Sequence, residues 1–194
     1  MKYFTTGIPG VVVFEPTPVR DDRGFFTRTF DIAIASEAGL DPTSFKQENQ
    51  SRSTLGGVRG LHGRLGVGEA KLVRCSYGAV LDVVVDARPG SPTFGTIETF
   101  MLDDVEHRQV YVPGGCLHGY QALTPTADFC YKSDRFYGPG EIGVDPLDKE
   151  LAIPWQEPIG RLSERDSTSP TWQEFVQSTL GISSAPRRPG QDLA

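Results

Sequence analysis

The sequence is poor in cysteine, and the cysteines that it has form no recognisable pattern. Its 194 residues include three, Cys75, Cys116 and Cys130, which lie far apart and form no CxxC pair. A disulfide framework is therefore not expected, and we interpret the three as reduced core residues of a cytoplasmic protein.

Long apolar runs and an excess of positive charge are also missing. No apolar segment approaches the length of a membrane span, and the first residues, MKYFTTGIPG, do not resemble a signal peptide. The formal net charge is −6 and the isoelectric point about 5.1, so neither a membrane nor nucleic acid is expected as a partner. A locally basic pocket for an anionic small molecule remains compatible with this charge.

Glycine and proline, by contrast, are abundant. The 22 glycines and 15 prolines punctuate short apolar runs, a pattern that favours an all-β architecture. Turn signals recur about every eight to twelve residues, as in a jelly roll or double-sheet barrel. Strands are expected over residues 8–14, 25–30, 45–53, 77–86, 96–102, 109–112, 120–123 and 127–132, with 135–137 as a further candidate. The near-continuous β-branched run within 77–86 implies burial on both faces.

Two short flanking helices are expected beside the strands. Asp31 is placed to cap a helix over residues 32–38, and Ser169 with Pro170 makes a good start for a helix over 171–180. A single domain over residues 1–183 accounts for the pattern, because we find no internal repeat and no second core. Residues 184–194 are expected to form a flexible tail.

The segment RGLHGRLGVGEAKLVR, residues 59–74, carries the first candidate chemistry. Its glycine-rich middle predicts a turn between two strands, and if these pair as a hairpin, His62 and Lys71 point to the same side of a sheet. A base and a positive charge in one cavity suit proton abstraction next to a carbonyl. A lone histidine is more often structural and a strand lysine is usually solvated, so the spacing alone leaves both interpretations open.

A polar strand over residues 45–53 is the second candidate element. Its alternate residues Gln47, Asn49 and Ser51 would face one side of the sheet. Such a face is either solvated or the wall of a polar cavity.

Residues 113–118 match PxGxxH, which resembles the second motif of the cupin superfamily. The first cupin motif carries HxH followed by Glu, and the corresponding residues here are His62, Arg64 and Glu69. Arginine has no lone pair to donate to a metal, which argues against a metal site, although two His and one Glu could still form an Fe(II) triad. The motif favours a cupin-type barrel and leaves the metal disfavoured.

Eight segments along the chain resemble, in order, those of one enzyme family. They are DRGFF (22–26), QENQS (47–51), RGLH (59–62), KLVRC (71–75), DVVVD (82–86), GSPTFG (90–95), HGY (118–120) and YKSDRFY (131–137). Together they resemble the dTDP-4-dehydrorhamnose 3,5-epimerase family over nearly the whole chain. The resemblance implies a metal-free, cupin-type jelly roll, usually a homodimer, that epimerises a dTDP-linked 4-keto-6-deoxyhexose at C3, C5 or both and needs no cofactor.

The resemblance also implies roles for individual residues. His62 corresponds to the base, with Asp166 as its carboxylate partner. Lys71 corresponds to the group that stabilises the enolate oxygen, and Tyr131 to the acid on the opposite ring face. We expect Asp166 to accept the Nδ1 proton of His62, which would leave Nε2 as the base. Binding of the nucleotide or the sugar is implied for Arg23, Gln47, Asn49, Arg59, His118, Tyr137, Glu141 and Arg165.

The chain departs from the family at a few positions. Arg28 stands where relatives usually carry Glu, which leaves the nucleotide preference open. Gly63 and Arg64 replace an aromatic-plus-polar pair, and the following loop is shorter, so the inverted carbon and the deoxysugar pathway stay open. A mono-epimerase or ketoisomerase of secondary metabolism is the closest alternative, followed by a metal-dependent cupin oxygenase and a non-catalytic sugar-nucleotide binding module.

Overall fold

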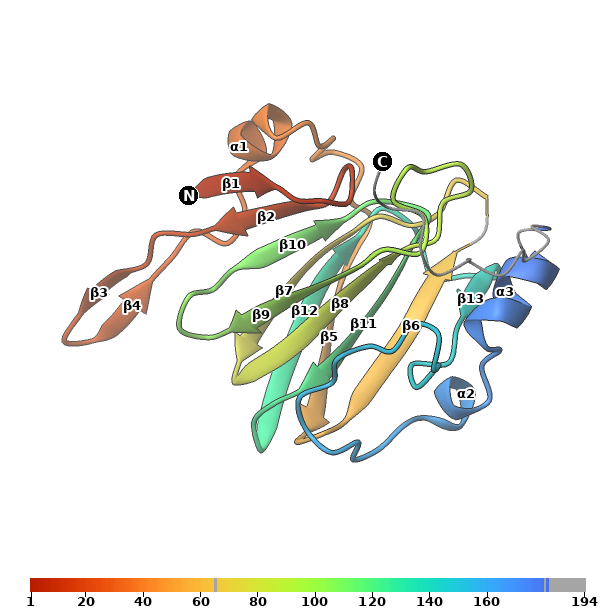
Figure 1. The fold of residues 1–194 in the computed structure, drawn as a ribbon. Coiled ribbons are helices and arrows are strands. Elements are labelled where there is room, and N and C mark those ends of the chain that lie inside the picture. Colours follow the sequence, from red (N-terminus) through yellow and green to blue (C-terminus); the bar gives the residue numbers. More distant parts are fainter. Residues whose placement is uncertain (65, 180, 182–194) are drawn as a thin grey trace, which may run out of the picture.

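The computed structural model describes residues 1–64, 66–179 and 181 and is built mainly of antiparallel strands (Figure 1). The strands are β1 Lys2–Thr5, β2 Val12–Glu15, β3 Val19–Asp21, β4 Gly24–Phe26, β5 Gln47–Thr54, β6 Val58–Arg64, β7 Lys71–Tyr77, β8 Ala79–Asp86, β9 Ile97–Asp103, β10 Gln109–Val112, β11 Cys116–Ala122, β12 Thr126–Ser133 and β13 Glu141–Gly143. The helices are α1 Ile32–Glu37, α2 Glu164–Ser167 and α3 Trp172–Thr179.

Two sheets lie face to face. One has six strands in the order β1-β2-β10-β7-β12-β5, and the other has five in the order β13-β6-β11-β8-β9 (Figure 1). The two sheets do not join into one closed barrel. This arrangement confirms the all-β, cupin-type jelly roll with short flanking helices that the sequence predicts.

Strand β8 shows how the sequence builds the core. Val80 and Val84 face the space between the sheets and pack with side chains of the six-stranded sheet, such as Phe129. The alternate residues, such as Val83, pack outward in a second apolar cluster with Phe175 of α3. Because side chains alternate along a strand, β8 is buried on both faces, as its β-branched run predicts.

Helices α1 and α3 pack on the outer faces of the two sheets, and α2 lies beside β6. Asp31 caps α1 by accepting from the backbone amides of Ala33 and Ile34, as predicted. The cap predicted for the C-terminal helix is wrong: α3 begins after Thr171, which exchanges hydrogen bonds with Glu174 in a capping box. Helix α2 follows Ser163 within a segment where no helix was predicted.

Several strand predictions need correction. The expected strand over residues 25–30 is only the short β4, and residues 135–137 form no strand; β13 follows them instead. The predicted hairpin between the His62 and Lys71 strands is also wrong, because β6 and β7 belong to different sheets. The two side chains therefore face each other across the space between the sheets.

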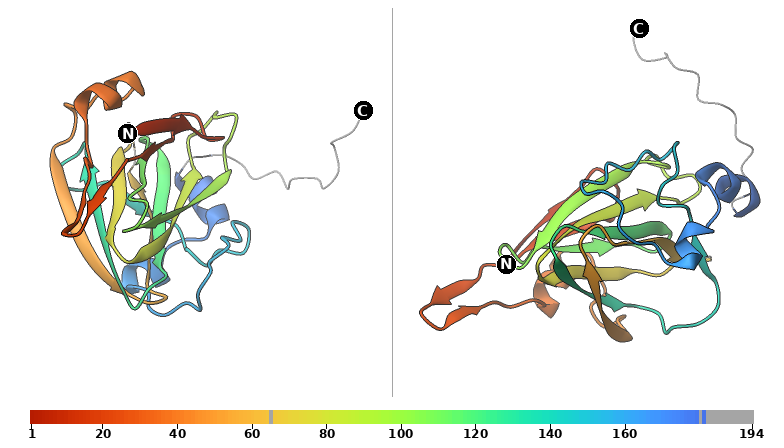
Figure 2. Two further views of the ribbon diagram at one scale, coloured as in Figure 1. Left: turned by 90° about the vertical axis from the view of Figure 1, so that its left-hand side faces the viewer. Right: turned by 90° about the horizontal axis from the view of Figure 1, so that it is seen from below.

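Strands β3 and β4 form a hairpin that projects from the rest of the molecule (Figures 1 and 2). Phe26 is 75% exposed, and Val19 and Phe25 are also exposed. On the body side, Phe25 packs against the His107 ring at 4.4 Å between centroids, and Arg20 donates to the carbonyl of Val105 at 2.7 Å. The hairpin thus carries apolar surface that its own chain leaves uncovered.

Three smaller expectations have different outcomes. Cys75, Cys116 and Cys130 are buried free thiols, as predicted. No helix in the described part of the chain is both long and apolar enough to cross a membrane. The tail predicted for residues 184–194 lies outside the described residues.

Candidate active site

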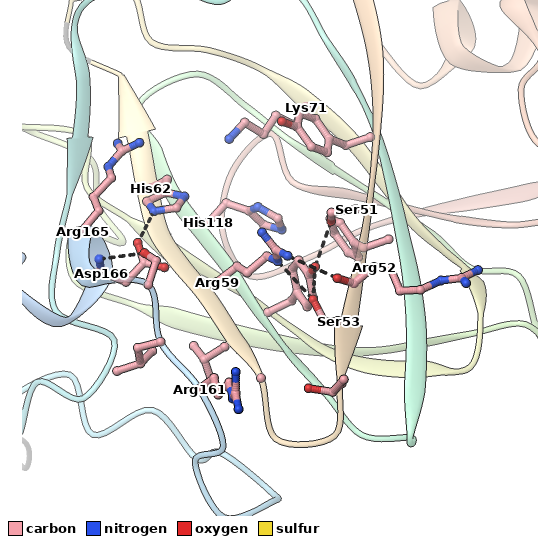
Figure 3. A pocket seen from close by; sticks show the side chains of 18 residues that line it. Ser51, Arg52, Ser53, Arg59, His62, Lys71, His118, Arg161, Arg165 and Asp166 are labelled. Atoms are coloured by element: carbon pink, nitrogen blue, oxygen red, sulfur yellow. Dashed lines mark hydrogen bonds and ion pairs between the residues drawn. The ribbon is translucent and has the colours of Figure 1, made fainter.

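A cavity of about 550 Å³ opens between the two sheets, within the size range of small-molecule sites (Figure 3). Lys71 and Arg161 lie at opposite ends of it, and His62, His118 and Arg59 lie between them. Although the chain as a whole is acidic, most of the charged side chains that line the cavity are basic. A cavity of this charge suits an anionic ligand.

His62 and His118 stand side by side on the wall formed by the five-stranded sheet. They are directly paired residues of the antiparallel strands β6 and β11. The two backbones approach closely next to this pair, since a Cβ atom on Gly60 would lie only 2.6 Å from the Cα of Gly119. Glycine at both positions therefore lets the strands pack with both imidazoles on the cavity side.

Asp166 of α2 forms a hydrogen bond with the imidazole of His62. Its Oδ1 lies 2.6 Å from His62 Nε2, and the Asp166 amide donates to Ser163 Oγ at 3.0 Å. The contact confirms the expected pair but corrects the expected nitrogen. Because Nε2 faces the carboxylate, Nδ1 is the nitrogen left for a base.

The carboxylate of Asp166 is almost fully buried, with 2% of the residue exposed. Burial by itself would raise the pKa of Asp166, but the hydrogen bond and the charge of His62, together with hydrogen bonds from Ser163 and Gly60, outweigh it. The pKa of Asp166 therefore lies below its usual value, and the group stays an anion next to His62.

A second histidine–carboxylate pair lies beside the first. His118 Nε2 is 2.7 Å from Asp82 Oδ1, and Asp82 is fully buried on β8. The His118 ring also stacks on Phe129 at 5.8 Å between centroids. These contacts fix the orientation of His118 at the cavity wall.

Lys71 and Tyr131 come from the opposite wall. Lys71 pairs with Ser133 across β7 and β12, so Tyr131, two positions before Ser133, shares its face. The Lys71 ammonium lies 5.5 Å from the centroid of the Tyr131 ring. The structure therefore brings the predicted base, its partner, the predicted lysine and the predicted acid around one space.

Burial dominates the electrostatics of both groups. It lowers the pKa of Lys71, which the charges of Glu69 and Glu141 oppose. It raises the pKa of Tyr131, and the charges of Glu69 and Glu141 raise it further. Tyr131 is therefore protonated at neutral pH, as a proton donor must be.

Two further basic side chains, Arg59 and Arg165, lie beside the histidines (Figure 3). Arg59 donates through Nε to Ser53 Oγ at 3.0 Å, and Ser53 Oγ in turn lies 2.9 Å from Tyr120 Oη. Arg165 also lines the cavity, next to His62, and donates to Glu141 Oε2 at 2.7 Å. The guanidinium of Arg59 is thus anchored by a hydroxyl network and Arg165 by a carboxylate.

Five of the predicted binding residues do not line this cavity: Arg23, Gln47, Asn49, Tyr137 and Glu141. Gln47 and Asn49 share the half-buried face of β5, as predicted, and the buried amide nitrogen of Asn49 has no hydrogen-bond partner. The amide of Tyr137 donates to Gln47 Oε1 at 3.1 Å. Arg23 lies at the turn of the projecting hairpin, paired with Asp21. Glu141 reaches the lining only through Arg165.

Comparison with known proteins agrees with this geometry. Residues 5–174 match the sequence profile of the family described as dTDP-4-dehydrorhamnose 3,5-epimerase. The chain is 39% identical over 184 residues to the protein of that name from Shigella flexneri, covering 94% of this chain and 100% of the relative. It is 44% identical over 168 residues to a dTDP-4-dehydrorhamnose 3-epimerase from Streptomyces niveus, covering 86% and 81%. The chain belongs to the dTDP-4-dehydrorhamnose 3,5-epimerase family.

A solved structure extends this similarity to the fold. The 4-keto-6-deoxy sugar epimerase from the novobiocin biosynthetic gene cluster of Streptomyces spheroides superposes with a TM-score of 0.89 at 42% identity. The match covers 93% of this chain and 92% of that one. Membership of the epimerase family therefore rests on the fold as well as on the sequence.

The positions that would hold a cupin metal are engaged otherwise in this member of the epimerase family. His62 and His118 each face a carboxylate through Nε2, and Glu69 Oε1 accepts from Ser133 Oγ. Arg64 occupies the position of the remaining ligand. Over the described ranges, no group of three or more His, Cys, Asp or Glu side chains is arranged to hold a metal ion.

Some residues at the site were not predicted from the sequence. Ser53 follows Ser51 by two positions on the strand whose alternation was recognised, so its side of the sheet could have been inferred; Tyr120 follows His118 by two positions, but the predicted strand began only at residue 120. Arg161 lines the cavity from a segment without regular structure and carries no such signal. Arg28, the departure from the family pattern, pairs with Asp31 at 2.6 Å and lies outside the cavity lining.

The depressed pKa of Asp166 makes a prediction about stability. A carboxyl with a lowered pKa in the folded state stabilises the fold above its unfolded pKa and loses this contribution as pH falls. The free energy of unfolding of the wild type should therefore exceed that of Asp166→Asn near neutral pH, and the difference should shrink below about pH 4. Urea unfolding between pH 7 and pH 3 measures it.

The same substitution at the exposed Asp22 serves as the control for this measurement. A difference between wild type and Asp166→Asn that stays constant across the whole pH range would contradict the described environment of Asp166.

Proposed function

We propose that the protein is an epimerase of a dTDP-linked 4-keto-6-deoxyhexose that works by proton abstraction and reprotonation. The observation that carries the proposal is the position of the His62–Asp166 pair on one wall of the cavity, opposite Lys71 and Tyr131 on the other. Names of the relatives in the family agree with this reaction.

In the proposed reaction, His62 Nδ1 removes a ring proton next to the C4 ketone. The resulting enolate carries negative charge on its oxygen, and the Lys71 ammonium stabilises this charge where water is largely excluded. Tyr131 then delivers a proton to the same carbon from the opposite ring face. Inversion requires a base and an acid on opposite faces, and the two walls of the cavity supply one each.

Asp166 contributes by fixing His62. As an anion it accepts the Nε2 proton, so the neutral imidazole keeps its lone pair on Nδ1. After proton abstraction the same carboxylate stabilises the imidazolium. The role resembles that of the carboxylate in a Ser-His-Asp triad, except that the histidine here takes its proton from a substrate carbon and not from a serine.

The nucleotide part is proposed to follow the basic side of the cavity. Arg59 and Arg165 flank the histidines, where a sugar held next to His62 would continue into its diphosphate. Guanidinium groups bind phosphate oxygens with paired hydrogen bonds. Arg161 lies at the end of the cavity opposite Lys71.

The relatives include both a 3,5-epimerase and a 3-epimerase, so the reaction is proposed for C3, for C5 or for both. One base and one acid serve either case, because a hexose that turns in the cavity presents a second carbon to the same pair. A mono-epimerase is therefore the second candidate function.

Loss of the base should abolish the first step. Removal of a general base costs about 10² to 10⁴ in rate, so His62→Ala should lose exchange of ring protons with D₂O at every carbon. Asp166→Asn should lose much of the rate while it keeps the geometry, because its amide no longer fixes the tautomer. Proton NMR of dTDP-4-keto-6-deoxyglucose in D₂O with each variant measures both effects and identifies the carbon that exchanges.

Binding of dTDP by His62→Ala, measured by calorimetry, is the control for an intact site. The losses of His62→Ala and Asp166→Asn should not add in the double variant, because the two residues act as one unit. Ring-proton exchange by His62→Ala near the wild-type rate would place the base elsewhere.

Loss of the acid should separate exchange from inversion. Tyr131→Phe keeps the base and Lys71, so a ring proton should still exchange with solvent. Little inverted product should form, because the phenolic proton donor is missing. Chromatography of the product alongside the NMR measurement tests this, and normal product formation by Tyr131→Phe would rule out Tyr131 as the acid.

The projecting hairpin leads us to propose a homodimer. Its exposed apolar residues include Phe26, and Arg23 at its turn has an 86% exposed side chain that does not line its own cavity. A hairpin laid against a second copy would bury this apolar surface and would give Arg23 access to the partner's anionic ligand. This reconciles the predicted binding role of Arg23 with its position.

Disruption of the hairpin surface should therefore disrupt the dimer. Phe26→Glu places a charge on the apolar hairpin, and light scattering at micromolar concentration should report a monomer where the wild type is a dimer. Leu147→Glu, at another exposed apolar residue, is the matched control and should leave the dimer intact. A monomeric wild type would contradict the proposal.

A further inference from the structure

Behind Lys71 lies a small group of buried charges that the proposed reaction does not use. Glu69 Oε2 is 3.8 Å from Lys71 Nζ and 3.9 Å from Arg64 Nε. All three side chains are largely buried, with 9%, 14% and 13% of their surface exposed. Glu69 and Arg64 do not line the cavity, so they contact the substrate's space only through Lys71.

The position of Glu69 is fixed from the other side. Ser133 Oγ, fully buried on β12, donates to Glu69 Oε1. The next residue along the chain, Ala70, donates its amide to Asp134 Oδ1 at 2.9 Å. Glu69 is therefore held against the same strand that carries Tyr131.

Arg64 is held through its two terminal nitrogens. One donates to the carbonyl of Pro139 at 2.9 Å and the other to the carbonyl of Phe136 at 3.4 Å, while its buried Nε has no hydrogen-bond partner. Glu69 thus lies between two cations and makes no direct hydrogen bond to either. An isolated ammonium is costly to bury, and a nearby carboxylate offsets that cost.

We propose that Glu69 is a positioning residue that holds Lys71 at its end of the cavity and keeps its ammonium group charged for the enolate. This inference rests on the proposed function, because it assigns Glu69 to the service of Lys71 in that reaction. Arg64 acts in the opposite direction, since its positive charge disfavours a second cation beside it.

Other charged groups also surround Lys71. Glu141 favours the ammonium and Arg165 disfavours it, and these two pair with each other at 2.7 Å. Tyr131 is the uncharged titratable neighbour from β12. Among the neighbouring charges, Glu69 does most to raise the pKa of Lys71 and also that of Tyr131, so one carboxylate supports both the cation and the proton donor.

The test is the pH dependence of ring-proton exchange. Ring-proton exchange requires a charged Lys71 to stabilise the enolate, so its rate must fall at high pH as Lys71 loses its proton. Glu69→Gln keeps an oxygen that can accept from Ser133 but removes the negative charge. The alkaline limb of kcat/KM for exchange should therefore move to lower pH by about one unit or more, a loss of about tenfold in rate at a fixed alkaline pH.

Two further variants give the sign of the effect. Glu69→Asp retains the charge and should keep the limb near its wild-type position. Arg64→Gln removes the opposing cation and should move the limb to higher pH. Arg64→Gln also keeps the proposal testable if Glu69→Gln does not fold, which thermal unfolding reports.

The outcomes separate this inference from the proposed function. If Glu69→Gln reduces the rate equally at all pH values, or changes nothing, Glu69 does not control the charge of Lys71 and the inference is wrong. If Arg64→Gln moves the limb to lower pH, it is also wrong. Lys71→Gln is measured in parallel: a variant that exchanges ring protons at the wild-type rate would overturn the proposed role of Lys71, whatever Glu69 does.

Discussion

The contact between His62 and Asp166 is the interaction on which the site depends. It joins β6 of the five-stranded sheet to the helix α2, which follows the last strand in the sequence. The same contact closes one side of the cavity and leaves a single imidazole nitrogen free. A buried carboxylate without this partner would be unfavourable, so the fold and the orientation of the histidine stabilise each other.

Electrostatic contrast is the second organising feature. The chain has a net charge of −6, yet basic side chains dominate the lining of its cavity. Several of these cations are held by neutral hydroxyls or by carboxylates outside the lining, as Arg59 is by Ser53 and Arg165 by Glu141. A cavity of this charge suits an anionic ligand.

Much of the fold follows from local sequence patterns. Period-two alternation identified the half-buried face of β5, and the β-branched run identified β8 as a strand buried on both sides. Pairing between strands was harder, because β6 and β7 resemble a hairpin locally but enter different sheets. Asp166 lies far along the chain from His62, and no periodicity links them; only the family resemblance suggested the pair, and the choice of Nε2 came from the structure. Glu69 was noticed only as a failed metal ligand, because its true neighbours are brought together by three strands.

The proposed mechanism requires the hexose to lie between His62 and Tyr131 with its two ring faces toward them. A crystal structure of the protein with a dTDP-linked 6-deoxyhexose that lacks the C4 ketone tests this most directly, since such a ligand cannot be enolised. We expect His62 Nδ1 and Tyr131 Oη to lie on opposite faces of the ring, the C4 oxygen to point toward Lys71 and the diphosphate to contact Arg59. A hexose with both residues on the same face, or with its nucleotide at the Lys71 end, would contradict it.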